Sequence, residues 1–385
     1  MNYTGLLNTY AKYPVEFVKG NGFNLYDKNG KEYTDFLCGI AVTSFGHNHP
    51  EIKAAAQKQF ESYWHASNLF QYSGQEELAK KLAERSGLNY VFFSNTGTEA
   101  NEAAIKIARK WGSGKFEIIS TIHGFHGRTY GGLSATGQYK FWEGFEPLVP
   151  GFSHVPYNDL EAVKNSITPK TVAVIVETIQ GEGGINCAST EYFKGLRKLC
   201  TEKNILLIID EVQTGIGRTG KFYSYQHHGI VPDIVTSAKA LANGFPIGAT
   251  ICTKEVGDAI KPGNHGSTFG GNPVAVAAAN KVVDLLDEKQ LMKIEKLGDY
   301  FKKSLLELNL SGIKEVRGKG LIIGVEFAQG ISCKEIAKKL LEEGILVGTS
   351  GDYVLRILPP FIITENEIAK FNSALKKVVS EVTKK

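Results

Sequence analysis

The chain has 385 residues, of which 42% are hydrophobic and 22% are charged, a composition typical of a soluble globular protein with a substantial core. Its formal net charge of +4 is small for this length and no run of lysine and arginine concentrates it, which argues against a nucleic-acid partner. The longest apolar runs are far too short to cross a membrane and no signal peptide is evident, so we expect a cytoplasmic enzyme.

The first forty-odd residues alternate between apolar and polar side chains and then turn. Residues 23–36 (FNLYDKNGKEYTDF) predict a hairpin closed at Asn29-Gly30.

From residue 90 the pattern changes to short apolar runs separated by helical or loop segments. Strands are predicted at 90–94, 116–120, 172–177, 205–210, 233–237 and 248–253, and helices at 96–112 and 190–204. This alternation indicates a mostly parallel sheet covered on both faces.

The pattern shifts again after the helix rich in small residues at 272–288. Segments 315–327, 333–344, 353–359 and 365–382 suggest a smaller α+β unit. We therefore expect an N-terminal segment, 1–45, that belongs to a small domain, a large domain at 46–275, and the C-terminal small domain at 276–385.

One glycine-rich stretch, GIGRTGKF at 215–222, matches the dinucleotide-binding pattern through Gly215, Gly217 and Gly220. That pattern requires a strand directly before it and a helix directly after it, and neither is predicted here. The stretch also resembles a phosphate-binding loop, but Phe222 stands where a serine or threonine would hold Mg²⁺. We favour a glycine-rich turn beside a site, and a nicotinamide-dependent dehydrogenase remains as the alternative from another class of enzyme.

Metal ligation is not predicted. Three histidine pairs occur, but none has metal-ligand spacing on a convincing helix and no third ligand lies nearby in the sequence. The five cysteines are scattered and odd in number, as expected for buried residues in a reducing compartment.

Two polar residues follow neighbouring apolar strands. Asp210 ends the strand at 205–210, and Lys239 follows the strand at 233–237. Since the carboxyl ends of parallel strands meet at one edge of a sheet, both should lie at the same rim. The pair could be a buried ion pair, or a lysine that forms a Schiff base beside an acid that binds a pyridinium nitrogen. Spacing alone leaves both interpretations open.

A predicted phosphate site favours the second interpretation. Gly97 and Thr98 lie between a strand and the N-terminus of a helix, where backbone N–H groups, a hydroxyl and the helix dipole all attract an anion. With an acid and a lysine on the same rim, an anionic cofactor accounts for all three features.

Several motifs together resemble the class III pyridoxal-phosphate aminotransferases. They are SNTGTEANEAAIKIAR, HGFHGRT, IQGEGG, DEVQTGIGRTG, SAKALANGFPIGA and STFGGNP, and the similarity runs essentially end to end. The resemblance implies a fold type I α/β transferase with pyridoxal 5'-phosphate as cofactor. The order and spacing of the motifs are most similar to the family members that act on N2-acetylornithine. Thr178 stands where the family usually has a proline.

The resemblance implies two catalytic residues, Lys239 and Asp210. Lys239 would bind the cofactor covalently and move a proton between substrate and cofactor, and Asp210 would stabilise the protonated ring nitrogen. The other implied cofactor contacts are Gly97 and Thr98 at the phosphate, Phe125 stacked on the ring, Gln213 at the phenolic oxygen, Glu211 and Val212 beside Asp210, and Thr268 from the second subunit of a C2 homodimer with shared sites.

The implied substrate contacts are Arg128 and Ser267 for acetylornithine and Arg356 for the α-carboxylate of glutamate, with Glu182 as a gate that pairs with Arg356. The expected reaction moves an amino group between N2-acetylornithine and 2-oxoglutarate, giving N-acetylglutamate 5-semialdehyde and glutamate, and its reverse would serve arginine biosynthesis. Aminotransferases for ornithine, succinylornithine, succinyldiaminopimelate or 4-aminobutyrate remain alternatives.

Overall fold

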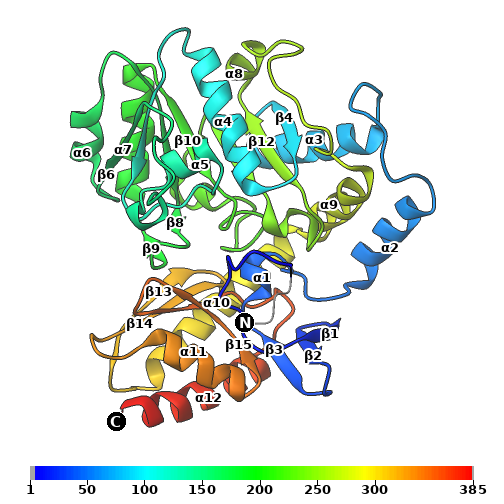
Figure 1. Ribbon diagram of the computed structural model, residues 1–385, viewed down its shortest axis with the longest axis vertical. Coiled ribbons are helices and arrows are strands. Elements are labelled where there is room, and N and C mark those ends of the chain that lie inside the picture. The colour runs from blue at the N-terminus through cyan, green and yellow to red at the C-terminus, as the bar shows by residue number, and fades with distance from the viewer. Residues whose placement is uncertain (1–4, 384–385) are drawn as a thin grey trace.

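The computed structural model describes residues 5–383 and is built around a seven-stranded sheet (Figure 1). The strand order is β4-β12-β11-β10-β7-β5-β6. Six strands run in one direction and β12 runs against them, as the pairings of β12 with β4 and β11 are antiparallel. The predicted mostly parallel sheet is confirmed. The bounds are β4 Tyr90–Ser94, β5 Glu117–Thr121, β6 Phe152–Val155, β7 Thr171–Glu177, β10 Leu206–Asp210, β11 Ile234–Ser237 and β12 Gly248–Cys252.

The central strands are apolar throughout because helices cover both faces of the sheet. Every residue of β7, β10, β11 and β12 is buried. Along β10, Leu207 and Ile209 pack into one hydrophobic cluster, whereas Leu206 and Ile208 pack into another on the opposite face. Successive side chains of a strand point to opposite faces, so one continuous apolar run serves two cores.

The helices around this sheet begin and end close to the predicted positions. α4 (Gly97–Trp111) packs against β10, β11 and β12, and α7 (Thr190–Lys203) packs against β10. Thr96 caps α4 and Asn204, with a φ of 49°, ends α7. The other helices of this region are α2 Pro50–Phe60, α3 Ser73–Ser86, α5 Tyr130–Ala135, α6 Leu160–Ser166, α8 Lys254–Asp258 and α9 Pro273–Leu285.

A smaller group of elements lies beside the large sheet and is formed by segments from the beginning and the end of the described residues (Figure 1). The predicted hairpin is present, with β2 (Asn24–Asp27) antiparallel to β3 (Glu32–Asp35) and Gly30 at a φ of 81° in the turn. β3 also pairs in parallel with β15 (Ile345–Leu346), and β1 (Phe17–Asn21) pairs with β2. This pairing joins the N-terminal segment to the C-terminal one.

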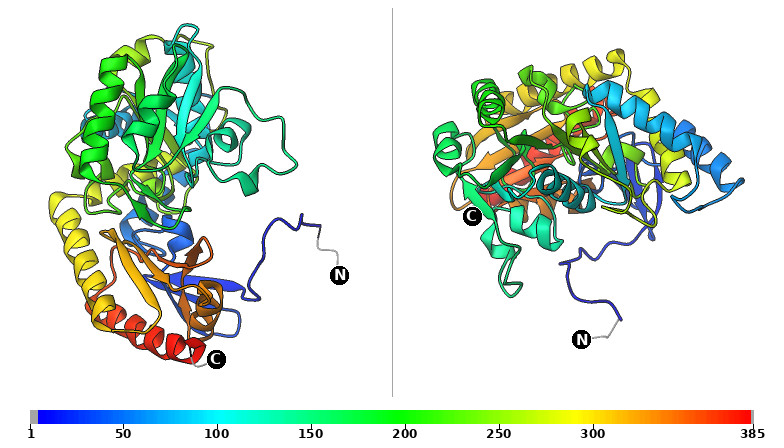
Figure 2. Two further views of the ribbon diagram at one scale, coloured as in Figure 1. Left: turned by 90° about the vertical axis from the view of Figure 1, so that its left-hand side faces the viewer. Right: turned by 90° about the horizontal axis from the view of Figure 1, so that it is seen from above.

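The second small sheet has the order β13-β14-β17-β16. Its strands are β13 Ile313–Lys319, β14 Ile322–Phe327, β16 Gly348–Ser350 and β17 Val354–Ile357. α10 (Glu288–Glu307) packs on β13 and β14, α11 (Cys333–Glu342) packs on β16 and β17, and α12 (Glu365–Thr383) packs against both helices (Figure 2). A separate two-stranded ribbon, β8 (Ile179–Gln180) with β9 (Asn186–Cys187), brings the loop between its strands towards this sheet. The short helix α1 spans Cys38–Ala41 and follows β3.

Two further features bear on function. Residues 215–220 form turns and open no helix, so they lack the context of a dinucleotide-binding motif. Between residues 5 and 383 no helix is both long and apolar enough to cross a membrane.

Candidate active site

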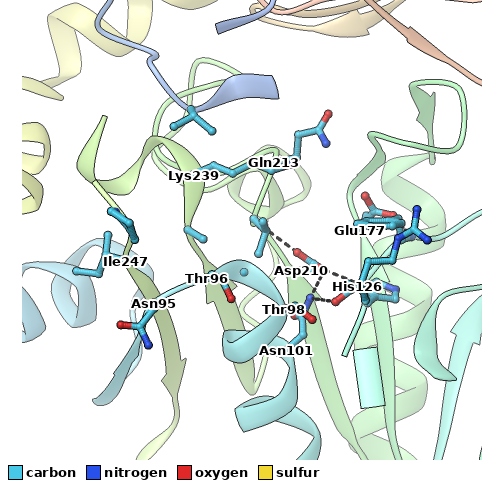
Figure 3. A pocket seen from close by; sticks show the side chains of 18 of the residues that line it. Asn95, Thr96, Thr98, Asn101, His126, Glu177, Asp210, Gln213, Lys239 and Ile247 are labelled. Carbon is cyan, nitrogen blue, oxygen red and sulfur yellow. Dashed lines mark hydrogen bonds and ion pairs between the residues drawn. The ribbon is translucent and has the colours of Figure 1, made fainter. Parts of the chain in front are cut away.

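A cavity of about 400 Å³ lies at the carboxyl ends of β10 and β11, against the N-terminus of α4 (Figure 3). Asp210 ends β10, and Lys239 follows β11 by two residues, as the sequence predicts. Both residues line the cavity. Parallel strands bring their carboxyl ends to one edge of the sheet, and Asp210 and Lys239 therefore lie at the same cavity, as expected.

Lys239 occupies a strained position at the cavity wall. Its φ of 47° lies in the left-handed region, which costs an ordinary residue free energy. Burial lowers the pKa of its amine; the nearby carboxylate of Glu182 opposes this effect and the guanidinium of Arg356 adds to it. A backbone held in an unfavourable conformation and an amine with a lowered pKa are features of functional lysines rather than of structural ones.

Asp210 is held by three donors. Its Oδ2 lies 2.8 Å from Asn101 Nδ2 and 2.8 Å from His126 Nδ1, and its Oδ1 accepts a hydrogen bond from the N–H of Val212 at 3.0 Å (Figure 3). Burial alone would raise the pKa of Asp210, but these hydrogen bonds, that of His126 first, outweigh burial and hold the pKa below its ordinary value. Asp210 is therefore an ionised, oriented carboxylate inside the cavity.

His126 and Glu177 extend this network. Burial alone would lower the pKa of His126, but its bond to Asp210 raises the pKa above the ordinary value. Burial raises the pKa of Glu177 to about 7, and its oxygens accept the N–H groups of Phe125 and Gly181 at 3.0 and 3.1 Å. Glu177 lies directly beside Asp210 in the sheet register.

The other end of the cavity is the N-terminus of α4, where Gly97 and Thr98 line the wall. Thr96 and Glu99 form a capping box, and the hydroxyl of Thr98 lies 2.8 Å from that of Thr129. N–H groups in the first turn of a helix have no partner within the helix, and the dipole there attracts anions. This end of the cavity suits a phosphate.

Three of the predicted cofactor contacts also line the cavity, namely Phe125, Val212 and Gln213. The structure does not bring Glu211 there. The carboxylate of Glu211 is fully buried on the other side of the chain, where it accepts hydrogen bonds from the hydroxyl of Thr214 at 2.6 Å and from the N–H of Tyr225 at 2.8 Å. Neighbouring residues of an extended segment point in opposite directions, so Glu211 supports the loop behind the site.

Ser267 and Thr268 lie outside the cavity. They line a separate surface hollow together with His65, Asn68 and Leu69. Ser267 Oγ accepts hydrogen bonds from Asn95 Nδ2 at 3.3 Å and from the N–H of Gly270 at 2.9 Å. A single chain therefore does not assemble every residue of the predicted site.

The predicted substrate arginines differ in their surroundings. Arg356 is buried and forms an ion pair with Glu182, and it also donates to the carbonyl of Gly181 at 3.0 Å. Burial alone would raise the pKa of Glu182, but Arg356 and then Lys239 outweigh it and lower the pKa. Arg128 lines the cavity with an exposed guanidinium 3.7 Å from the ring centroid of Phe141. Thr178 is buried and does not prevent the pairing of Glu182 with Arg356.

Sequence reasoning missed Asn101, His126 and Glu177 as members of the site. Asn101 and His126 both occur within motifs quoted for the resemblance, so their position in the sequence was available but their partner was not. Glu177 ends β7 just as Asp210 ends β10, so the strand-end rule that identified Asp210 could also have identified Glu177.

The family model "Aminotransferase class-III" matches residues 7–379. The chain belongs to the class-III aminotransferase family. Acetylornithine aminotransferase of Aquifex aeolicus (strain VF5) is 49% identical over 381 residues, covering 98% of this chain and 100% of that protein. Acetylornithine aminotransferase of Bacillus subtilis (strain 168) is 46% identical, covering 98% of each chain.

Solved structures agree with this family. The crystal structure of ornithine aminotransferase from Toxoplasma gondii ME49 superposes with a TM-score of 0.94 at 37% identity, covering 98% of this chain and 93% of that one. The N-acetylornithine aminotransferase from Stenotrophomonas maltophilia K279a superposes with a TM-score of 0.85 at 32% identity, covering 97% of each chain. The predicted fold type I class and the predicted aminotransferase are confirmed, and the dehydrogenase alternative is wrong.

Pyridoxal phosphate is the cofactor of this family, and the cavity of this aminotransferase fits it. An amine, an ionised carboxylate and a helix N-terminus face one space that also has apolar walls. Gly97 allows Val212 to approach closely, because a Cβ at Gly97 would lie 2.5 Å from Val212 Cγ1. The residues present therefore match an anionic aromatic aldehyde in charge and in shape.

Proposed function

We propose that this aminotransferase moves an amino group between N2-acetylornithine and 2-oxoglutarate, giving N-acetylglutamate 5-semialdehyde and glutamate, with the reverse direction serving arginine biosynthesis. The observation that carries the proposal is the amine of Lys239 and the carboxylate of Asp210 in one cavity that ends at the N-terminus of α4. The full-length similarity to relatives named acetylornithine aminotransferase supports the choice of substrate.

Each catalytic role follows from the environment of the residue. The bound cofactor supplies an electron sink for the reacting carbon of the substrate. Lys239 would hold the cofactor covalently until the amine of the substrate displaces it. The freed amine of Lys239, with its lowered pKa, would then accept a proton from the substrate carbon and return it. Asp210 stays ionised and therefore stabilises a positive charge on the ring nitrogen. Asn101 and His126 orient Asp210 for this contact.

The remaining cofactor contacts are assigned by position. Gly97 and Thr98 would hold the phosphate at the first turn of α4, and Phe125, Val212 and Gln213, which line the same cavity, would contact the ring and its phenolic oxygen. We exclude the side chain of Glu211 from the contacts, because its oxygens are occupied behind the site.

The substrates are separated by their charges. Arg128 binds acetylornithine at the mouth of the cavity. Ser267 lines a separate hollow of its own chain beside Thr268, and it completes this contact only in the dimer described below. Glu182 neutralises Arg356 while this substrate is bound, since its reacting end carries no carboxylate. When 2-oxoglutarate or glutamate binds, Glu182 moves away and Arg356 takes the α-carboxylate.

The enzyme acts as a C2 homodimer in which Thr268 completes the phosphate site of the partner subunit. The separation of Thr268 from the cavity of its own chain supports this arrangement. Large apolar side chains also stay exposed close to that region, including Trp64, Leu69 and Phe269. Burial of such a patch between two copies would stabilise a dimer.

The chain organisation is consistent with these roles. We assign residues 1–45 and 276–385 to a small domain and 46–275 to the large domain, supported by the pairing of β3 with β15. The five cysteines are all free, which suits a reducing compartment such as the cytoplasm.

Replacement of Lys239 tests the chemistry. Lys239→Ala should abolish turnover and the visible absorption of the bound cofactor, whereas Lys221→Ala, which changes an exposed lysine of the glycine-rich turn, should leave both unchanged. A Lys239→Ala enzyme that kept its absorption and turnover would overturn the assignment.

A panel of amino donors tests the substrate. Ornithine is the second candidate, because the Toxoplasma gondii ornithine aminotransferase superposes closely on this chain. We expect N2-acetylornithine to give the highest kcat/KM among acetylornithine, ornithine, succinylornithine, succinyldiaminopimelate and 4-aminobutyrate. Preference for free ornithine over its acetylated form would replace our choice with an ornithine aminotransferase.

A further inference from the structure

The loop that carries Glu182 is tied at both ends by one hydroxyl. Residues 181–185 connect β8 to β9, with Gly181 and Gly184 near the two ends of this loop. Ser350, the last residue of β16, accepts a hydrogen bond from the N–H of Gly184 at 2.7 Å and donates one to the carbonyl of Gly181 at 3.1 Å. Ser350 is only 2% exposed, so water does not compete for these bonds.

Two arginines of the same small sheet add to this attachment. Arg317 on β13 donates to the carbonyl of Gly184 from Nε at 3.0 Å and from Nη2 at 2.6 Å. Arg356 on β17 donates to the carbonyl of Gly181 at 3.0 Å, in addition to its ion pair with Glu182. The loop is therefore bound to the β13-β14-β17-β16 sheet through its backbone as well as through Glu182.

The backbone of the loop fits closely against its neighbours in this arrangement. Gly184 has a φ of 113°, and a Cβ at Gly183 would lie 2.5 Å from the carbonyl oxygen of His123. A displacement of Glu182 that moves this backbone would break both bonds to Ser350. These bonds consequently belong to the arrangement in which Glu182 covers Arg356.

We propose that Ser350 is a positioning residue that stabilises the closed position of Glu182 and so sets how readily Arg356 becomes available to a dicarboxylate. The inference rests on the proposed function, in which Glu182 leaves Arg356 for 2-oxoglutarate. Ser350 does not touch the substrate. It acts through the Gly181–Gly184 backbone, which it holds against the small sheet.

This role predicts an asymmetric effect on the two substrates. Without the hydroxyl the closed loop loses two hydrogen bonds and leaves a buried N–H without a partner, so the small open population grows. The affinity for a ligand of the open form rises in proportion to that population, by about 3- to 10-fold. The closed form remains dominant, so the affinity for acetylornithine hardly changes.

The test uses the holoenzyme with Ser350→Ala. Calorimetric titration with glutarate, a dicarboxylate without a reacting group, should show a Kd about 3- to 10-fold lower than in the wild type. The KM for 2-oxoglutarate should fall by a similar factor, with the KM for N2-acetylornithine unchanged. Thr349→Ala is the matched control, because Thr349 is the adjacent residue of β16 and faces the other side of the strand.

Comparison of Glu182→Ala with Ser350→Ala tests the gate and the role of Ser350 separately. Glu182→Ala should tighten glutarate binding, and Ser350→Ala should have no further effect in that background. If Glu182→Ala leaves glutarate binding unchanged, the gate itself is wrong. If Glu182→Ala tightens glutarate binding but Ser350→Ala does not, or if Ser350→Ala weakens the binding of both substrates equally, Ser350 has only a structural role.

Arg317→Met removes the other bonds to Gly184 and should shift glutarate binding in the same direction as Ser350→Ala. This variant tests the loop independently if Ser350→Ala does not fold.

Discussion

The contact between Gly97 and Val212 allows a quantitative prediction about cofactor binding. In Gly97→Ala the new methyl would lie 2.5 Å from Val212 Cγ1 and 2.9 Å from Cγ2, whereas ordinary contacts begin near 3.4 Å, so Val212 must move by about 0.9 Å. Val212 lines the cavity and is hydrogen bonded through its N–H to Asp210. Overpacking of this size costs about 1–3 kcal/mol, partly offset by about 1 kcal/mol from the better helix propensity of alanine.

Since Val212 moves into the space of the cofactor, we expect most of this cost to fall on binding. Titration of the apoenzyme with pyridoxal phosphate, followed by fluorescence quenching, should give a Kd about 10-fold higher for Gly97→Ala. In Gly97→Ala/Val212→Ala the nearest remaining atom is the Cβ of residue 212, at 3.3 Å, which needs only a small adjustment. The double variant should therefore bind within about threefold of Val212→Ala alone. If Val212→Ala gives no rescue, the methyl acts against the ligand directly and the steric argument is refuted.

Two further predictions concern stability. Burial raises the pKa of Glu211 from 4.5 to about 7, so the free energy of unfolding of the wild type should fall by about 3 kcal/mol as pH rises between those values. Urea unfolding should show the wild type losing that much stability relative to Glu211→Gln within this pH window, and a difference that does not depend on pH would contradict the raised pKa. Arg218→Met removes the buried donor to the carbonyls of Leu321 and Pro359 and to the hydroxyl of Ser44. The free energy of unfolding should therefore fall by about 3–5 kcal/mol. A loss below about 1 kcal/mol would show that these acceptors find other donors.

The centre of the site could be predicted because local rules determine it. Lys239 and Asp210 follow apolar runs that only a covered parallel sheet accommodates, and the ends of its strands converge. Gly97 and Thr98 open a helix directly after its capping residue, Thr96, which is a local signal. The glycine-rich stretch 215–222 could be rejected as a nucleotide site because no α-helix opens directly from it.

The rest of the site depends on contacts between distant parts of the chain. Ser350 meets Gly181 across 169 positions, and Asn101 meets Asp210 across 109. Neither partner can be inferred from spacing or periodicity. The orientation of β12, which runs against its neighbours, is similarly invisible in a strand that is buried on both faces and shows no alternation. The sequence could not show that the carboxylate of Glu211 turns away from the cavity, because a motif gives adjacency in sequence, not direction in space.

The arrangement of charges explains how a lysine can stay buried with a lowered pKa. Asp210 is balanced by His126, whose pKa is raised, and Glu182 is balanced by Arg356. These two carboxylates are thus already paired, so neither provides the full attraction that would hold a proton on the amine of Lys239. In the proposed function, binding of a dicarboxylate would preserve this condition, because its carboxylate would replace that of Glu182 on Arg356. If Glu182 moved away without such a replacement, Arg356 would be left unpaired beside the amine of Lys239. Since the charge of Arg356 disfavours a second positive charge nearby, the pKa of Lys239 would then fall further. In the proposed function, the pKa of Lys239 therefore stays lowered through both halves of the reaction.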